Sequence, residues 1–183
     1  VAIITEKGGS AEINTIDFRN IKISPCSIDT VRLIYPLESM DEDEWYMKYG
    51  RCGIDAYTSF LGAKFEGMTI EGCDYAMRFN RIPRETVANQ SGLINISQCY
   101  FEANTKYDLY FGKGNTSILP GYNMSIYVIN VDKCLFNSGN IHLEEGEFTF
   151  TNIGGGNRKL NFDRTSSDYK LKLYVDSTHN YIG

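Results

Sequence analysis

The sequence predicts an all-β fold, a right-handed parallel β-helix of about six to seven coils. Three observations predict this solenoid. A short motif recurs around every cysteine, apolar and polar residues alternate beside it, and the segments between the motifs are rich in residues typical of strands and turns. At 183 residues the chain has the size of one domain. We therefore expect a single β-helix domain over residues 1–183, with a lead-in segment at 1–20, regular coils at 21–162 and a last coil or exit segment at 163–183.

The motif is seen most easily in INISQCYF, residues 94–101, where two spaced apolar residues precede a cysteine and an aromatic residue follows it. The other cysteines stand in the same frame, in IKISPCSI, MKYGRCGI, MTIEGCDY and INVDKCLF, at Cys26, Cys52, Cys73 and Cys134. A sixth copy, FTFTNIGG, has Ile153 in place of the cysteine. Successive anchors are 26, 21, 26, 35 and 19 residues apart. This near-periodic spacing predicts a stack of coils, one for each copy.

The alternation before each cysteine predicts a strand with its two apolar residues facing inward. The residue between them is polar in every copy, and we expect these residues to form an outward ladder: Lys22, Lys48, Thr69, Asn95, Asn130 and Thr149. A second strand is expected after the turn, at Val31/Leu33, Met77/Phe79, Leu109/Phe111, Ile141/Leu143 and Leu160/Phe162. The return segments contain aromatic and β-forming residues and leave little room for helices, which favours a β-helix over a leucine-rich repeat.

The composition narrows the range of partners. A net charge of −5 argues against binding to duplex nucleic acid, which needs a basic face to neutralise phosphates. No stretch approaches the ~20 apolar residues that a membrane-spanning helix needs, so we expect no membrane insertion. The five cysteines are an odd number in a common frame, which favours small buried side chains over a disulfide framework.

The segment CYFEAN, residues 99–104, and its neighbours resemble the coils of the pectate-lyase-like superfamily, in which an apolar pair, a Cys or Asn, a Phe and a turn Asn recur. The resemblance covers residues 21–162 and concerns architecture. This scaffold carries pectate lyases, polygalacturonases and bacteriophage tailspike or tail-fibre proteins, and the chain is most similar to a tailspike or tail-fibre segment. The polygalacturonase motifs NxD, DD, GHG and RxK have no counterpart here, and a shared fold does not transfer an activity.

An acidic insertion, residues 36–45, is the first candidate site. Four consecutive carboxylates, Asp41 to Glu44, stand beside Trp45 and Tyr46. Carboxylates next to an aromatic platform suit sugar binding, and the same oxygens could ligate calcium, although a run of charges is usually a solvated loop. No other cofactor and no assigned metal site are expected. The residues expected to contact carbohydrate are Asp43, Glu44, Trp45, Tyr46, Arg81, Arg84 and Tyr122.

Three carboxylates are candidate catalytic residues. Asp29 and Asp55 each lie three residues after a cysteine and are expected to stack on adjacent coils, and Glu102 holds the same frame two coils later. Like charges in a stack raise the pKa of at least one carboxyl group, which is how a general acid arises. Roles in turns explain the same positions equally well.

These patterns lead us to expect a structural, glycan-contacting module of a phage tail spike, tail fibre or similar virion appendage. It would serve host surface attachment and reside in the virion tail, outside the cell or on the cell surface. Bare strand edges at uncapped ends predict a homotrimer, contacts with other virion proteins, and a chain that is part of a longer one. The alternatives are a polysaccharide-degrading hydrolase or lyase that uses a carboxylate pair, and a secreted bacterial adhesin.

Overall fold

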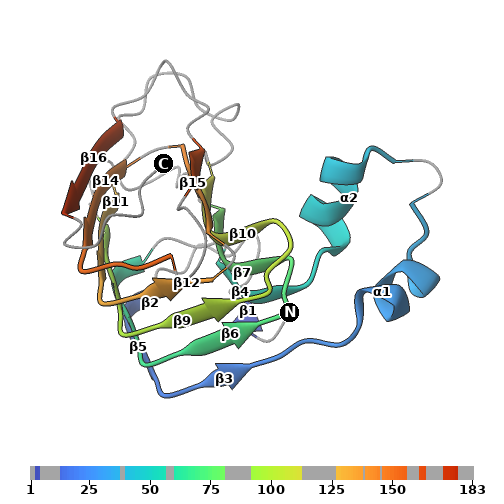
Figure 1. Cartoon of the computed structure of the whole chain (residues 1–183), viewed down its shortest axis with the longest axis horizontal. Coiled ribbons are helices and arrows are strands. Elements are labelled where there is room, and N and C mark those ends of the chain that lie inside the picture. The colour runs from blue at the N-terminus through green and yellow to red at the C-terminus, as the bar shows by residue number, and fades with distance from the viewer. Residues whose placement is uncertain are drawn as a thin grey trace.

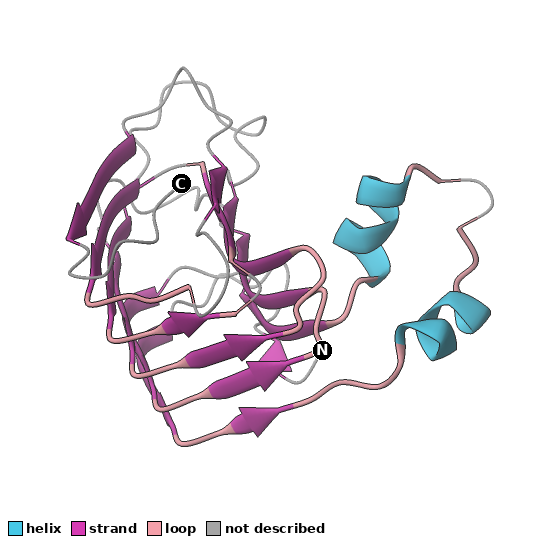
Figure 2. Ribbon diagram, viewed as in Figure 1, coloured by secondary structure: helices cyan, strands magenta, loops and turns pink. Residues whose placement is uncertain are grey.

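The computed structural model describes residues 3–4, 13–37, 40–56, 60–80, 92–112, 127–137, 139–144, 146–155, 161–163 and 171–176. Its strands form three sheets in which every pair is parallel (Figures 1 and 2). The chain passes from one sheet to the next in a repeating order, so each of the first four coils contributes one strand to each sheet. Within the described residues, the last two coils contribute strands to two of the sheets. The predicted parallel solenoid is confirmed, with about five to six coils rather than six to seven.

We call the three sheets A, B and C. Sheet A contains β1 (Ile3–Ile4), β4 (Cys52–Ala56), β7 (Tyr75–Asn80), β10 (Tyr107–Gly112), β13 (Asn140–Leu143) and β15 (Asn161–Asp163). Sheet B contains β2 (Ile13–Arg19), β5 (Phe60–Glu66), β8 (Gly92–Ser97), β11 (Tyr127–Asp132), β14 (Gly146–Thr151) and β16 (Leu171–Asp176). Sheet C contains β3 (Lys22–Ile23), β6 (Thr69–Glu71), β9 (Tyr100–Glu102) and β12 (Leu135–Phe136). Strands β1 and β2, which precede residue 21, thus already belong to sheets A and B, respectively.

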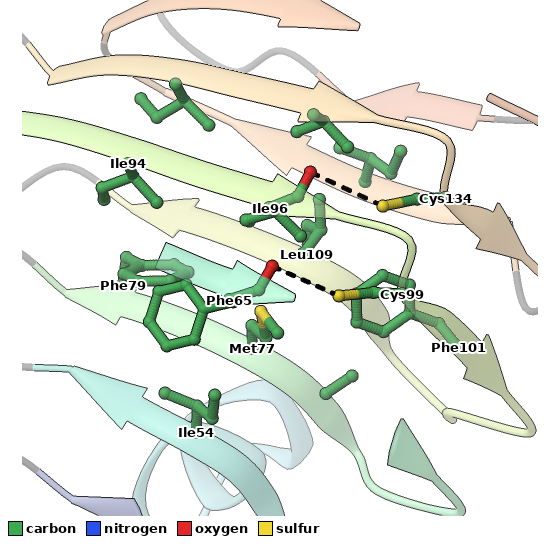
Figure 3. Close-up of a cluster of buried hydrophobic side chains, with 14 of the residues drawn as sticks. Ile54, Phe65, Met77, Phe79, Ile94, Ile96, Cys99, Phe101, Leu109 and Cys134 are labelled. Atoms are coloured by element: carbon green, nitrogen blue, oxygen red, sulfur yellow. Dashed lines mark hydrogen bonds between the residues drawn. The ribbon is translucent and has the colours of Figure 1, made fainter. Parts of the chain in front are cut away.

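The interior is built from ladders of apolar residues that stand in register on successive coils. One ladder in sheet B contains Ala63, Ile94, Ile129, Phe148 and Leu173. The corresponding ladder in sheet C contains Ile23, Ile70, Phe101 and Phe136. The rings of the last two stack with centroids 5.0 Å apart. Figure 3 shows Ile94 and Phe101 of these ladders among other buried side chains of the core, such as Phe65. Each buried aliphatic or aromatic side chain contributes about 1.5–3 kcal/mol to folding.

The predicted return strands lie in sheet A. The pairs Met77/Phe79, Leu109/Phe111 and Ile141/Leu143 fall in β7, β10 and β13, in mutual register. Phe162 lies in β15, and Leu160 lies outside the described residues. Val31 and Leu33, in contrast, lie in a helix, so no return strand forms there.

The cysteines do not share one position in the coil, and this part of the prediction is wrong. Cys99, Cys134 and Ile153 follow strands of sheet B, where the preceding residue has a positive φ and turns the chain towards sheet C. Cys26 and Cys73 instead follow strands of sheet C, and Cys52 opens a strand of sheet A. A strand followed by a turn produces the same local pattern at any corner of the coil, so the frame alone does not identify the corner.

The cysteines that follow sheet B strands each donate a hydrogen bond from the thiol to a backbone carbonyl of the preceding coil. Cys99 Sγ donates to the carbonyl oxygen of Phe65 at 3.6 Å, and Cys134 Sγ donates to that of Ile96 at 3.7 Å (Figure 3). Four cysteines are buried as predicted, whereas Cys26 is exposed. Burial raises the pKa of the Cys52 thiol to about 12.

The predicted polar ladder is only partly correct. Asn95, Asn130 and Thr149 stand in register on the outer face of sheet B, and Asn130 Nδ2 donates to Asn95 Oδ1 at 3.2 Å. Lys22 and Thr69 are paired with each other in sheet C, and Lys48 lies in a helix. Both differences arise because the motifs that contain Lys22, Lys48 and Thr69 lie at other corners of the coil than those that contain Asn95 and Asn130.

Two helices, α1 (Ile28–Ile34) and α2 (Glu42–Tyr49), are inserted between β3 and β4 and stand at one side of the solenoid (Figures 1 and 2). The expectation that the return segments leave little room for a helix is therefore wrong for this coil. The acidic run begins α2: Asp41 is the N-cap, and its Oδ1 accepts from the backbone nitrogen of Asp43 at 2.9 Å. Carboxylates in a first helical turn also interact favourably with the helix dipole. No helix in the described part of the chain is long and apolar enough to span a membrane.

Candidate functional site

Helix α2 packs against the outer face of sheet A. Trp45 is fully buried and forms a cluster with Tyr46, Cys52 and Tyr75. Its indole nitrogen donates to the carbonyl oxygen of Tyr35 at 2.8 Å, which ties α2 to the end of α1. The Trp45 ring is therefore occupied by packing rather than presented to a ligand.

A buried ion pair reinforces this contact and accounts for the position of Asp55. Arg78 Nε donates to Asp55 Oδ1 at 2.9 Å, and a second guanidinium nitrogen, Nη2, contacts Asp55 Oδ2. Both side chains are at most 3% exposed. Arg78 Nη1 also donates to the carbonyl oxygen of Met47 in α2 at 2.8 Å. The pair therefore links two adjacent strands to the helix that covers them.

The three candidate catalytic carboxylates do not stack as expected. Asp29 lies exposed in the first turn of α1, Asp55 lies in sheet A, and Glu102 lies in sheet C. Glu102 is paired in register with Glu71, and its Oε1 accepts from Asn137 Nδ2 at 3.2 Å. Its hydrogen bond with the Tyr100 hydroxyl raises the pKa of that phenol. The reason for the difference is again the register, since the three cysteines that precede these positions occupy different corners or lead into a helix.

The residues expected to contact carbohydrate lie mostly on α2. Asp43 and Glu44 are exposed in its first turn, and Tyr46 is 5% exposed. Lys106 Nζ lies 3.0 Å from Asp43 Oδ1 and 4.3 Å from the centre of the Tyr46 ring. Arg81, Arg84 and Tyr122 lie outside the described residues.

A groove of about 460 Å³ lies between α2 and the outer face of sheet A. One part of its lining is aromatic, formed by Tyr75, Tyr107, Tyr110 and His142. The polar part includes Asp43, Lys106, Asn140 and Asn161. We call this feature the sheet A groove.

The parallel register creates the aromatic wall of the groove. Tyr75 pairs with Tyr107, and Tyr110 pairs with His142, so like positions on successive coils meet on the outer face. The Tyr110 and His142 rings stack with centroids 4.5 Å apart and an angle of 5° between their planes. The Tyr75 ring meets the edge of Tyr110 at 5.6 Å. Tyr107 and Tyr110 are partly exposed, whereas Tyr75 and His142 are 3% and 5% exposed. The rings therefore form one aromatic wall across three strands, in which Tyr107 and Tyr110 present most of the accessible surface and the other two support them.

Polar groups border this surface. His142 Nε2 lies 2.9 Å from Glu144 Oε1, and Asn140 is in register with Asn161 on the next strand. Aromatic faces bordered by amide, carboxylate and ammonium groups suit sugar rings, because the rings cover apolar C–H faces while the polar groups bond to hydroxyls.

The sequence analysis did not single out Tyr107, Tyr110, Asn140 or His142. A signal was present for two of them, because Arg78, Tyr110 and His142 each stand between the two apolar residues of a return strand. Reading those outward positions as a ladder would have found Tyr110 and His142. Within the described residues, no group of three or more His, Cys, Asp or Glu side chains is arranged to hold a metal ion.

Comparisons of the chain with protein families, with curated proteins and with solved structures found no match.

Proposed function

We propose that this protein is a structural β-solenoid module that contacts a surface polysaccharide through the sheet A groove. In this proposal it belongs to a phage tail spike, tail fibre or similar virion appendage and serves attachment to the host surface. The observation that carries the proposal is the aromatic wall of Tyr75, Tyr107, Tyr110 and His142 with its polar border.

The groove has the size and the rigidity that a sugar site needs. Its volume of about 460 Å³ falls in the range of about 300–1,000 Å³ that is typical of ligand pockets. Three of its aromatic residues lie on β7 and β10, whose inner faces are packed in the core, so the rings are held in place before a ligand binds. Successive coils are about 4.8 Å apart, which offers a polymer repeated contacts along the solenoid axis.

The carboxylates support binding more than hydrolysis. Glycosidases place two carboxyl groups about 5–5.5 Å or about 6.5–9.5 Å apart in an open groove. Among the described residues that line the sheet A groove, Asp43 is the one carboxylate. Asp55 is engaged in its ion pair with Arg78, and Asp29 and Glu102 lie on other elements.

We propose the virion setting from the resemblance of the coils to tailspike segments. We propose that the chain assembles into a homotrimer and contacts other virion proteins. Exposed apolar side chains on the outer faces of sheets B and C, such as Leu93 and Leu135, supply surface for such contacts.

A glycan array with host surface polysaccharides tests the proposal. An aromatic contact contributes about 0.5–1.5 kcal/mol beyond its buried area, so Tyr107→Ala and Tyr110→Ala should each weaken binding by about two- to tenfold. The matched control is Tyr174→Ala, because Tyr174 is 62% exposed on sheet B and lies outside the groove. Equal binding by all three variants and the parent protein would refute the groove as the contact site.

The same polysaccharides are then assayed for release of new reducing ends. Release that Asp43→Asn abolishes while folding is retained would replace the proposal with a depolymerase. Binding without release supports the attachment module.

A further inference from the structure

A second pocket, of about 720 Å³, lies where the two helices meet the first coils. Its walls come from the segment after β3, from both helices and from the residues that lead into β4. None of its described lining residues lines the sheet A groove. We call it the hinge pocket, after its place at the base of the helical insertion.

The charged side chains in the described lining of the hinge pocket are both cations, Lys48 and Arg51. Lys48 is exposed, and its ammonium lies 5.2 Å above the Tyr49 ring. Within the described part of the chain, no carboxylate lies within ion-pair distance of Lys48. Its charge is therefore available to a ligand.

Arg51 is held in a fixed position with donors to spare. Its Nε and Nη2 donate to the fully buried carboxylate of Asp74 at 3.1 and 3.0 Å, and Nη1 donates to the carbonyl oxygen of Cys26 at 3.1 Å. A guanidinium has five N–H donors, so two remain after these three bonds. A guanidinium anchored in this way can bond to an oxyanion without losing much conformational entropy.

Aromatic rings complete the pocket. The Tyr35 and Tyr49 rings stack with centroids 4.4 Å apart and an angle of 8° between their planes. Both residues line the pocket, together with Ser24, which adds a hydroxyl group. Two cations beside flat rings suit a ligand that joins an oxyanion to a ring with apolar C–H groups.

We propose that the hinge pocket binds a sugar that carries a carboxylate, phosphate or sulfate group. Lys48 and Arg51 bind the oxyanion, and the ring of Tyr35, which is 46% exposed, lies against the sugar. The inference rests on residues other than those of the sheet A groove, so either proposal can fail while the other stands.

Cys26 supplies a local reporter for the test. It lines the hinge pocket and is exposed, whereas the other four cysteines are buried. Alkylation of the full chain by N-ethylmaleimide is followed by mass spectrometry in the presence of glucuronate, glucose 6-phosphate, glucose 6-sulfate or glucose. The anionic sugars should slow alkylation of Cys26, glucose should not, and the ranking of the three anions identifies the group that is bound.

Lys48→Gln should weaken this protection by roughly tenfold, because one charge-assisted hydrogen bond to the ligand is lost. The matched control is Lys133→Gln, which removes an exposed lysine outside the pocket at a turn position where Gln98 already stands in the previous coil. Equal loss in the two variants, or equal protection by glucose and the anionic sugars, would overturn the proposal. Protection by inorganic phosphate that matches glucose 6-phosphate would overturn the sugar part.

Discussion

Replacing Asp55 with asparagine is expected to lower the free energy of unfolding by about 3–5 kcal/mol. The substitution keeps the shape of the side chain but removes the charge that neutralises Arg78. Arg78, whose side chain is 3% exposed, would then lose the carboxylate that it contacts through two nitrogens. Burial of a charge without its counter-ion is among the most destabilising changes that one substitution can make.

The size of the effect follows from the geometry. The two side chains are joined by two contacts, one of 2.9 Å, so their charge centres are about 4 Å apart. Unit charges at that separation attract each other by about 4 kcal/mol at an effective dielectric constant of about 20. Asparagine retains part of the hydrogen bonding, which places Asp55→Asn towards the lower end of the range and Arg78→Met towards the upper end.

Urea unfolding measures the prediction directly. Trp45 is the one tryptophan of the chain and is buried in the cluster beside this pair, so its fluorescence reports the region. The double variant Asp55→Leu, Arg78→Met removes both charges and should lose less stability than either single variant, since neither charge is left alone. A loss below about 1 kcal/mol for Asp55→Asn, or losses that add in the double variant, would refute the reasoning.

Three further predictions concern the core, a helix cap and the response to acid. Ile96→Ala should cost about 2–5 kcal/mol because Ile96 is fully buried, while Ile96→Val should cost about 0.5–1.5 kcal/mol; equal losses in urea unfolding would contradict the packing described here. Asp41→Ala should cost about 1 kcal/mol by removing the N-cap of α2, and Asp41→Asn, which keeps an acceptor, should cost less in the same measurement. Hydrogen bonds from Asn152 and Thr151 hold the pKa of Asp132 below its ordinary value of 3.8. Asp132 therefore adds stability that is present above that value and is lost as the pH falls through the lower folded-state pKa. Unfolding midpoints between neutral pH and about pH 3 should fall less in Asp132→Asn than in the parent chain, and parallel curves would show that this carboxyl group plays no part.

The helical insertion shows what local sequence reasoning missed. Ser27 and Asp41 are N-cap residues, and acidic residues follow each of them, which is typical of helix starts. The same residues were interpreted as a charged loop because the surrounding pattern predicts strands and turns. Reading the acidic run as the first turn of a helix would have found α2.

The residues of the sheet A groove are brought together by strand pairing between segments that lie far apart in the sequence. Tyr75, Tyr107, Tyr110 and His142 are spread over 68 residues of chain, and they meet because β7, β10 and β13 pair in one register. A shift of one residue would have sent each side chain to the opposite face. Asp29, Asp55 and Glu102 illustrate this sensitivity, because a shared local frame did not bring them together.

By itself, the sequence determined the parallel solenoid, its apolar interior and the burial of most of its cysteines. These properties follow from alternation with a period of two and from a repeat that can bury its apolar face only by stacking. The tertiary structure alone decided which corner each cysteine occupies, which carboxylates meet a cation, and where α2 covers sheet A to form a groove. The reason is physical: alternation specifies which side of a strand faces inward, whereas the neighbours of an outward side chain depend on pairing between coils that lie far apart in the chain.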